Sequence, residues 1–284
     1  MLPELLPLIV SSDGFVTHAL ATSAGSLSPR TRWKDLAQFR LFLPSLDVQR
    51  RIVRVSAVAL DQADAFTSAA RAASVVARAG FANELSGHPE WRQVDLADIL
   101  MQSPESGCSA PESPRETGHF VLGLQAVSRA GYVPGQFKPV EPTAEMLKAR
   151  LRHGDVLVTR SNTLDRVGFA AIYGEDTENV SFPDTMMRLR PNAEVVLDAF
   201  LVAVLMSPLG RRHLMRVAAG TSASMKKINH KTLATLQFPL PPLAEQRRLL
   251  DAYTERIDLA HRLSAVAACA TGVVSALRQE VFDY

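Results

Sequence analysis

Residue types that often carry catalysis or cross-links are scarce in this sequence. It has two cysteines, Cys108 and Cys269, far apart in the chain, and its seven histidines show no metal-ligand spacing. Neither a structural disulfide nor a metal site is therefore expected. Runs of the types Gly-x-x-x-x-Gly-Lys, Gly-x-Gly-x-x-Gly and Asn/Asp-Pro-Pro-Tyr are missing as well. These absences argue against a free-standing enzyme, and we predict no catalytic residue and no cofactor.

An excess of charge of one sign is also missing. The sequence has 31 Lys and Arg against 29 Asp and Glu, a formal net charge of +2. Total charge therefore predicts no attraction to nucleic acid, and any DNA site must be a local patch. The apolar start, Met1 to Val10, is short, is interrupted by Pro3 and Pro7, and lacks a basic leader. We expect neither a signal peptide nor a membrane span, and hence a cytoplasmic protein with no membrane partner.

A ten-residue motif that occurs twice organises the chain. Residues 240–249 read Leu-Pro-Pro-Leu-Ala-Glu-Gln-Arg-Arg-Leu, and residues 43–52 read Leu-Pro-Ser-Leu-Asp-Val-Gln-Arg-Arg-Ile, 197 positions earlier. Each copy follows a strand-like apolar run (39–43 and 236–240) that stops at proline, which has no N–H to donate to a sheet. A helix is expected to begin there, with Asp47 or Glu245 at the positive end of its dipole.

Two long helices are predicted after these motifs, at 45–86 and 243–284. Apolar residues step by three or four from Ile52 to Ala77 and from Leu250 to Val281, without proline. This pattern is close to that of a coiled coil. A helix of about 40 residues is about 60 Å long and cannot bury its own apolar seam. We therefore expect the two helices to pair as an antiparallel coiled coil; two separate core helices are the alternative.

The rest of the chain divides around these helices. Residues 88–242 mix strands and helices without regular alternation, which favours an α+β domain. Residues 1–44 parallel the end of that domain, because 5–14 resembles 201–210 and 22–26 resembles 220–224. We interpret 1–44 as the tail of a domain whose body is not in this sequence; a compact cap that lacks nothing is the alternative. The predicted layout is thus 1–44, 45–87, 88–242 and 243–284.

The repeated motif, a proline-rich strand end followed by Leu-x-Glu-Gln-Arg-Arg and a long helix, resembles the DNA-specificity (S) subunit of type I restriction-modification systems. The second copy fits that pattern better than the first. The resemblance implies that 88–242 is a complete target-recognition domain of mixed α/β fold, that 1–44 is a remnant of another, and that the helices are spacers. It implies docking of methyltransferase subunits and, indirectly, of the restriction subunit. We assign partner contacts to Gln49, Arg50, Gln246 and Arg247.

A basic stretch near the end of the globular domain is the first candidate for DNA contacts. Residues 199–244 contain six Lys and Arg and no Asp or Glu. Lys and Arg neutralise phosphates, and hydroxyl and amide groups add hydrogen bonds. A solvated basic face that serves only solubility is the alternative. The predicted contacts are Arg211, Arg212, Thr221, Ser222, Lys226, Lys227, Asn229 and Lys231.

A polar loop after a predicted strand is the second candidate. Arg160, Ser161 and Asn162 follow the run Gly-Asp-Val-Leu-Val-Thr at 154–159. Arg can bond guanine in two places, and Asn can do the same with adenine. The run resembles a common recognition-domain pattern, which favours a functional loop; a surface hairpin with an internal salt bridge is the alternative.

These observations predict a non-enzymatic subunit that binds double-stranded DNA and reads one half of a split site. A second copy of the chain, or another S polypeptide, would supply the other half. Methylation and cleavage would belong to the partners. A degenerate or regulatory scaffold that no longer reads DNA is the main alternative, and a free-standing enzyme is the third.

Overall fold

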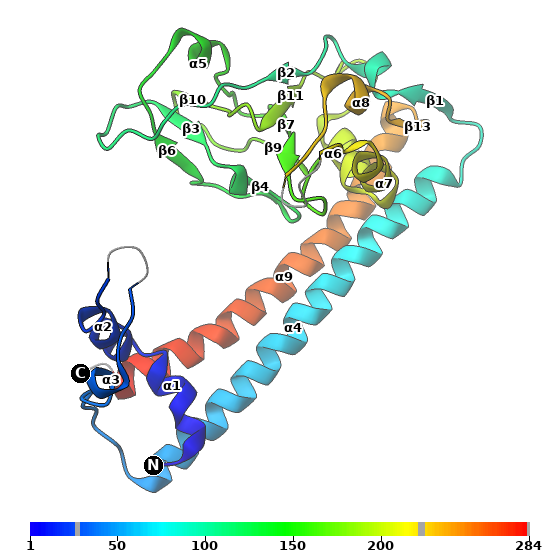
Figure 1. Ribbon diagram of the computed structural model, residues 1–284. Helices are drawn as coiled ribbons and strands as arrows, with labels where there is room; N and C mark the ends of the chain where they lie inside the picture. The colour runs from blue at the N-terminus through cyan, green and yellow to red at the C-terminus, as the bar shows by residue number, and fades with distance from the viewer. Residues whose placement is uncertain (26–28, 221–224, 283–284) are drawn as a thin grey trace. The chain divides into compact units, whose positions relative to one another are not determined.

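The computed structural model describes residues 1–25, 29–220 and 225–282. The chain forms two compact units (Figure 1). The first unit comprises residues 1–74 and 257–284, and the second comprises residues 75–256.

Two long helices, α4 (Leu46–Ser86) and α9 (Leu243–Phe282), contribute to both units. In the first unit, Ile52 shares an apolar cluster with Val274 and Phe282. In the second, the rings of Phe81 and Tyr253 lie 5.3 Å apart. The beginning of α4 therefore meets the end of α9 and the reverse, so the predicted antiparallel pairing is confirmed.

In the middle of both helices, buried positions recur every seven residues. Among the buried residues these are Ser56, Ala63, Ala70 and Ala77 in α4, and Ala260, Ala267 and Val274 in α9. A seven-residue period keeps one seam facing the partner helix, as in a coiled coil. By length and composition α9 also contains a stretch apolar enough to cross a membrane. Its packing against α4 accounts for the apolar residues of the seam.

The second unit is built around a four-stranded antiparallel sheet in the order β2 (Glu105–Ser106), β11 (Met186–Leu189), β7 (Val156–Thr159) and β9 (Ala170–Ile172). Every residue of β7 and β11 is buried. A second sheet has the order β10 (Val180–Ser181), β3 (Phe120–Leu122) and β6 (Phe137–Pro139), with β10 and β3 parallel. Mixed strand directions and separate helices confirm the predicted α+β class.

Three two-stranded ribbons complete the second unit. They pair β1 (Arg92–Asp95) with β13 (Gln237–Leu240), β4 (Val127–Ser128) with β5 (Gly131–Tyr132), and β8 (Ser161–Asn162) with β12 (Lys226–Lys227). Short helices η2 (Leu96–Ile99), η3 (Leu124–Ala126) and α5 (Ala144–Lys148) connect strands. After the sheets come α6 (Asp198–Met206), α7 (Pro208–Val217) and α8 (His230–Ala234). Helix α6 packs against β9, with α7 beside it (Figure 1).

The first unit begins with η1 (Pro3–Leu5), α1 (Leu6–Val10), α2 (Asp13–Ala21) and α3 (Trp33–Leu36). These elements repeat the polar contacts of α6, α7 and α8. Ser12 caps α2 as Ser207 caps α7, each accepting a 3.3 Å hydrogen bond from the backbone N–H three residues later. His18 lies 2.8 Å from the carbonyl of Asp35, and His213 lies 3.1 Å from that of Thr232. The sequence parallel between 5–14 and 201–210 thus extends to these contacts, with Ser12 and not Ser11 as the counterpart of Ser207. In the other parallel, between 22–26 and 220–224, residues 26 and 221–224 lie outside the described residues.

One expected strand did not form. The run 39–43 is not a strand, whereas its counterpart is β13. Strand β13 pairs with β1 through all four of its residues. Within the part of the first unit that the structure describes, 39–43 has no such partner, and a strand needs one to satisfy its backbone groups.

Candidate nucleic-acid interface

A two-stranded ribbon joins the two predicted DNA-contacting stretches. Strands β8 and β12 are antiparallel, with Lys226 opposite Asn162 and Lys227 opposite Ser161. The ladder continues at Arg160, whose carbonyl accepts a 3.0 Å hydrogen bond from the N–H of Ile228. The stretch 160–162, expected to be a loop, is therefore held as part of a ribbon. It brings basic and amide side chains from distant parts of the sequence to one place.

The side chains of this ribbon differ in how far they are free to contact a ligand. Lys227 is exposed, while Ser161 is buried. The side-chain oxygen of Asn162 accepts a 2.9 Å hydrogen bond from the N–H of Thr163. No hydrogen bond of its amide nitrogen is seen within the described residues. The Nε of Arg160 is buried and has no hydrogen-bond partner within the described part of the chain. An unsatisfied buried donor is costly, and a ligand acceptor would relieve that cost.

Two of the residues after β12, Asn229 and His230, make contacts within the protein. The side-chain oxygen of Asn229 accepts a 2.8 Å hydrogen bond from the N–H of Thr232 and so caps α8. His230 Nε2 lies 3.0 Å from the hydroxyl of Ser106. Burial and then the charge of Arg160 lower the pKa of His230 below its usual value. Lys231 is exposed and free to meet a phosphate.

Arg211 points inward rather than toward solvent. Its guanidinium donates to the carbonyls of Val167 at 2.7 Å and Asp165 at 3.1 Å, and it lies 4.8 Å from the centre of the Phe169 ring. The chain turns at Gly168, directly after the segment 165–167 that carries these carbonyls. There φ is +76° and an added Cβ would come within 2.8 Å of Leu214. Arg211 therefore fixes the backbone that follows the ribbon.

The other predicted contacts in this region do not join the ribbon. Arg212 is exposed and lines a separate cavity of about 390 Å³ with His213 and Arg216. Thr221 and Ser222 lie outside the described residues. Their contacts remain predictions.

A cavity of about 490 Å³ opens beside the ribbon. Asn162 lines it together with Gln125, Arg129 and Arg166, over a floor that includes Phe169. Amide side chains suit adenine, and guanidinium groups suit guanine. The side chain of Gln125 is exposed and lines this cavity. Nothing in the linear sequence places Gln125 or Arg129 beside Asn162; only the fold does.

Comparison with known proteins supplies a second line of argument. No protein-family model matches the chain. The specificity subunit of the type I restriction enzyme EcoKI from Escherichia coli (strain K12) is 27% identical over 181 residues, covering 60% of this chain and 38% of the relative. The StySPI specificity subunit from Salmonella potsdam is 27% identical over 176 residues, covering 59% of this chain and 38% of the relative.

A solved structure agrees with these relatives in fold. The S subunit of a type I restriction-modification system from M. genitalium has a TM-score of 0.53 at 14% identity, covering 98% of this chain and 74% of that one. The chain is similar, in sequence and in fold, to type I specificity subunits. The resemblance expected from the repeated motif is thereby confirmed. The chain spans less than two fifths of the length of the EcoKI and StySPI subunits.

The motif that carried this resemblance to type I specificity subunits has an internal role. Gln246 is fully buried; its amide donates to the carbonyls of Val195 and Pro241, each at 2.8 Å, and its oxygen accepts from Leu197 N–H at 2.9 Å. Gln49 is also buried and donates to the Pro44 carbonyl at 2.7 Å. The expected partner contacts are therefore wrong for both glutamines, because their polar atoms are occupied inside the protein. Arg50 and Arg247 are exposed, and their partner contacts stay predictions.

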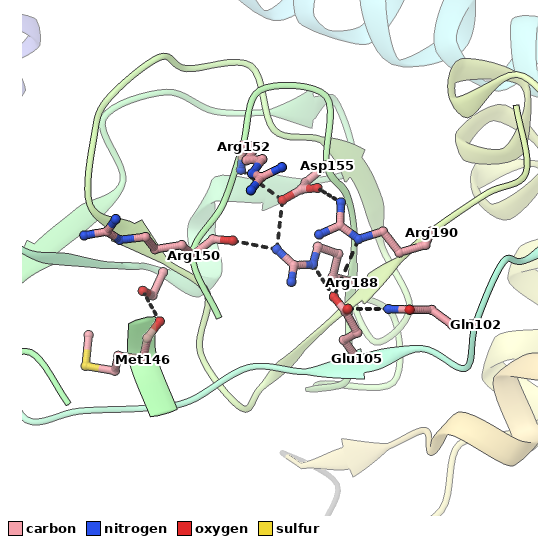
Figure 2. A network of polar contacts seen from close by, with 9 residues as sticks. Gln102, Glu105, Met146, Arg150, Arg152, Asp155, Arg188 and Arg190 are labelled. Carbon is pink, nitrogen blue, oxygen red and sulfur yellow. Dashed lines mark hydrogen bonds and ion pairs between the residues drawn. The ribbon is translucent and has the colours of Figure 1, made fainter. Parts of the chain in front are cut away.

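A buried ion network supports the central sheet (Figure 2). Asp155 accepts from Arg188 at 3.0 Å, from Arg190 at 2.7 Å and from the backbone N–H of Arg152 at 2.9 Å. Glu105 pairs with Arg188 from the other side. The carboxylates of Asp155 and Glu105 compensate the positive charges of Arg188 and Arg190, so we interpret the network as structural. Within residues 1–25, 29–220 and 225–282, no group of His, Cys, Asp and Glu side chains could hold a metal ion.

Proposed function

We propose that this chain is a sequence-specific DNA-binding subunit of a type I restriction-modification complex and reads one half of a bipartite site. The observation that carries the proposal is the pairing of β8 with β12, which sets Lys226 and Lys227 beside Asn162. A two-stranded ribbon fits the major groove of DNA. Lysines at the ribbon would bind phosphates, while Asn162, Arg160 and the neighbouring cavity would meet base edges.

The proposal extends to the layout of the chain. Residues 88–242 would be the target-recognition domain, and 1–44 the base of a second such domain. Segments 45–87 and 243–284 would act as spacers. The similarity of α1–α3 to α6–α8 in their capping and histidine contacts supports this division. The chain would work in the cytoplasm without a cofactor, and catalysis would belong to its partners.

A second apolar stripe on α9 supports docking of methyltransferase subunits, with the restriction subunit held indirectly. Leu259, Val266 and Val273 recur every seven residues and are 43 to 48% exposed. They lie next to the buried seam positions but do not enter the seam. An exposed apolar stripe on a helix is the kind of surface onto which another helix packs.

The other half of the site would come from a second copy of this chain or from another S polypeptide. A homodimer predicts a two-fold symmetric split site, because the symmetry of the protein imposes the symmetry of the site. Methylome sequencing of cells that express the chain with its cognate methyltransferase subunit tests this. A symmetric split motif supports the homodimer, an asymmetric one supports a second polypeptide, and no new methylation contradicts sequence-directed modification by this chain.

DNA binding by the purified chain tests the ribbon directly. Changing Lys226 and Lys227 together to Ala should weaken binding and reduce the slope of log K against log salt by about 0.9 for each phosphate that is no longer neutralised. Lys34→Ala is the matched control, since Lys34 is an exposed lysine of the first unit. Equal binding by all three proteins would favour the scaffold that does not read DNA.

A further inference from the structure

A small cavity in the second unit is lined by three arginines. Its volume is about 210 Å³, and it lies where α4, the β4–β5 turn and the start of α7 meet. Arg78 comes from α4, Arg129 from the turn and Arg211 from α7. The remaining lining residues are Val75, Phe169, Met206 and Pro208, so the described lining contains no carboxylate.

Backbone carbonyls hold two of these arginines in place. Arg78 donates to the carbonyl of Arg129 at 2.6 Å, and Arg211 donates to the carbonyl of Val167 at 2.7 Å. A carbonyl fixes a guanidinium but does not neutralise its charge. The lining of this cavity thus differs from the ion network at Arg188, where the carboxylates of Asp155 and Glu105 pair with the arginine.

Holding these like charges together has an electrostatic cost. Burial first and then the charge of Arg129, against the opposing effect of Asp165, lower the pKa of Arg211 to about 10. Burial also lowers the pKa of Arg78, where Arg129 acts in the same direction and Tyr253 opposes it. Both shifts mean that the surroundings disfavour the positive charge. An anion in the cavity would reverse that effect.

The backbone adds to the attraction for an anion. Pro208 is the first residue of α7 and lines the cavity, so the positive end of a ten-residue helix lies at its wall. Helix starts bind phosphate groups through their dipole and free N–H groups. The volume corresponds to several water molecules at about 30 Å³ each, which is enough for a phosphate group.

The cavity adjoins the candidate base-reading cavity. Arg129 and Phe169 line both. We propose that the cavity lined by Arg78, Arg129 and Arg211 binds a phosphate group, and that this group belongs to the backbone of the DNA that the ribbon reads. The inference rests on the proposed function for the source of the phosphate. Because Arg78 belongs to α4, the contact would fix the register of the DNA against the spacer helix, as phosphate contacts do.

Arg129→Ala is the variant that tests the cavity. Arg129 has an exposed side chain, and the carbonyl that holds Arg78 remains after the change. Arg129→Lys keeps the charge. Arg54→Ala, which alters an exposed arginine of α4 in the first unit, is the matched control. Without an anion, Arg129→Ala should not lower the melting temperature, because a repulsive charge is removed.

Inorganic phosphate is the first probe, applied to the full chain. It should raise the melting temperature of the wild type, Arg129→Lys and Arg54→Ala by more than that of Arg129→Ala. Phosphate also stabilises proteins by exclusion from their surface, and the difference between variants removes that general effect. An equal rise in all four proteins overturns the anion site.

Duplex DNA carrying the methylated motif is the second probe. Arg129→Ala should reduce the salt slope by about 0.9, because one phosphate would no longer be neutralised. An unchanged slope with normal DNA binding overturns this inference and leaves the proposed function standing. Phosphate stabilisation without any DNA binding by the wild type overturns both the proposed function and DNA as the source of the phosphate.

Discussion

Gln49 and Gln246 occupy equivalent positions 197 residues apart and make the same two kinds of hydrogen bond. Each donates to the carbonyl of the proline five residues earlier, at 2.7 Å for Pro44 and 2.8 Å for Pro241. Each also accepts from the backbone N–H of a residue before a short helix, at 3.0 Å for Leu2 and 2.9 Å for Leu197. The glutamine of the motif thus connects the start of a long helix, through hydrogen bonds, to a neighbouring helical segment.

Gln246→Ala should lower the free energy of unfolding by about 2–4 kcal/mol. The change leaves three backbone groups without this partner, one in a buried hydrogen bond and two in partly buried ones. An unsatisfied buried group costs about 1–3 kcal/mol. Urea denaturation followed by circular dichroism would measure it. Arg247→Ala, which alters the exposed neighbour, should change stability by no more than about 0.5 kcal/mol. A similar effect of both changes would contradict the internal role of Gln246.

Asp155→Asn should be more damaging. The change removes the negative charge that pairs with Arg188 and Arg190, and Arg188 is only 5% exposed. Removing one partner of a buried ion pair typically costs about 3–5 kcal/mol. Thermal and chemical denaturation would show the loss, with Asp251→Asn, an exposed acid of α9, as the control. Equal stability of the two variants would mean that solvent or Glu105 alone compensates Arg188.

The exposed stripe of α9 should matter for assembly and not for folding. Val266→Ser and Val273→Ser together should change stability by no more than about 0.5 kcal/mol for each site, because both side chains are already exposed. Under the proposed function the same double variant should lose co-purification with the methyltransferase subunit. Val16→Ser, an exposed valine of α2, is the control. If the double variant still co-purified fully with the methyltransferase subunit, the stripe would not be part of the docking surface.

His230 should make the protein less stable in acid. Its pKa is lowered in the folded state by burial and by Arg160, so the unfolded chain takes up the proton first as the pH falls through about 6.5. Stability is therefore lost from that pH downward to the folded pKa. Between pH 7.5 and 5.5 the wild type should lose more stability than His230→Gln. His261→Gln, an exposed histidine of α9, should behave as the wild type.

The helices and the repeat could be predicted because their causes are local. An apolar period over about 40 residues, a proline at the start and an acidic first turn are all read within one segment. The same holds for the α+β class, since strand and helix signals follow one another irregularly from 88 to 242. The similarity of α1–α3 to α6–α8 was visible in part, because 5–14 resembles 201–210 and both stretches end in Ser-x-x-Gly.

The site could be predicted only in part. The sequence pointed to Arg160 to Asn162 and to Lys226 and Lys227 by residue type, but their pairing joins positions about 64 apart and is set by the ladder of β8 and β12. The partner contacts of Gln49 and Gln246 were wrong because burial depends on what packs against a residue, which residue type does not reveal. Gln125 and Arg129 were missed for the same reason.

The start of each long helix, its apolar seam and the repeated segments all follow from the amino-acid sequence, because these features depend on neighbours within a few turns. Which polar groups face a cavity, and which form hydrogen bonds inside the protein, depends on the packing of distant segments. The convergence of Arg78, Arg129 and Arg211 from α4, a turn and α7 shows why, because charges that meet in space need no proximity in the chain.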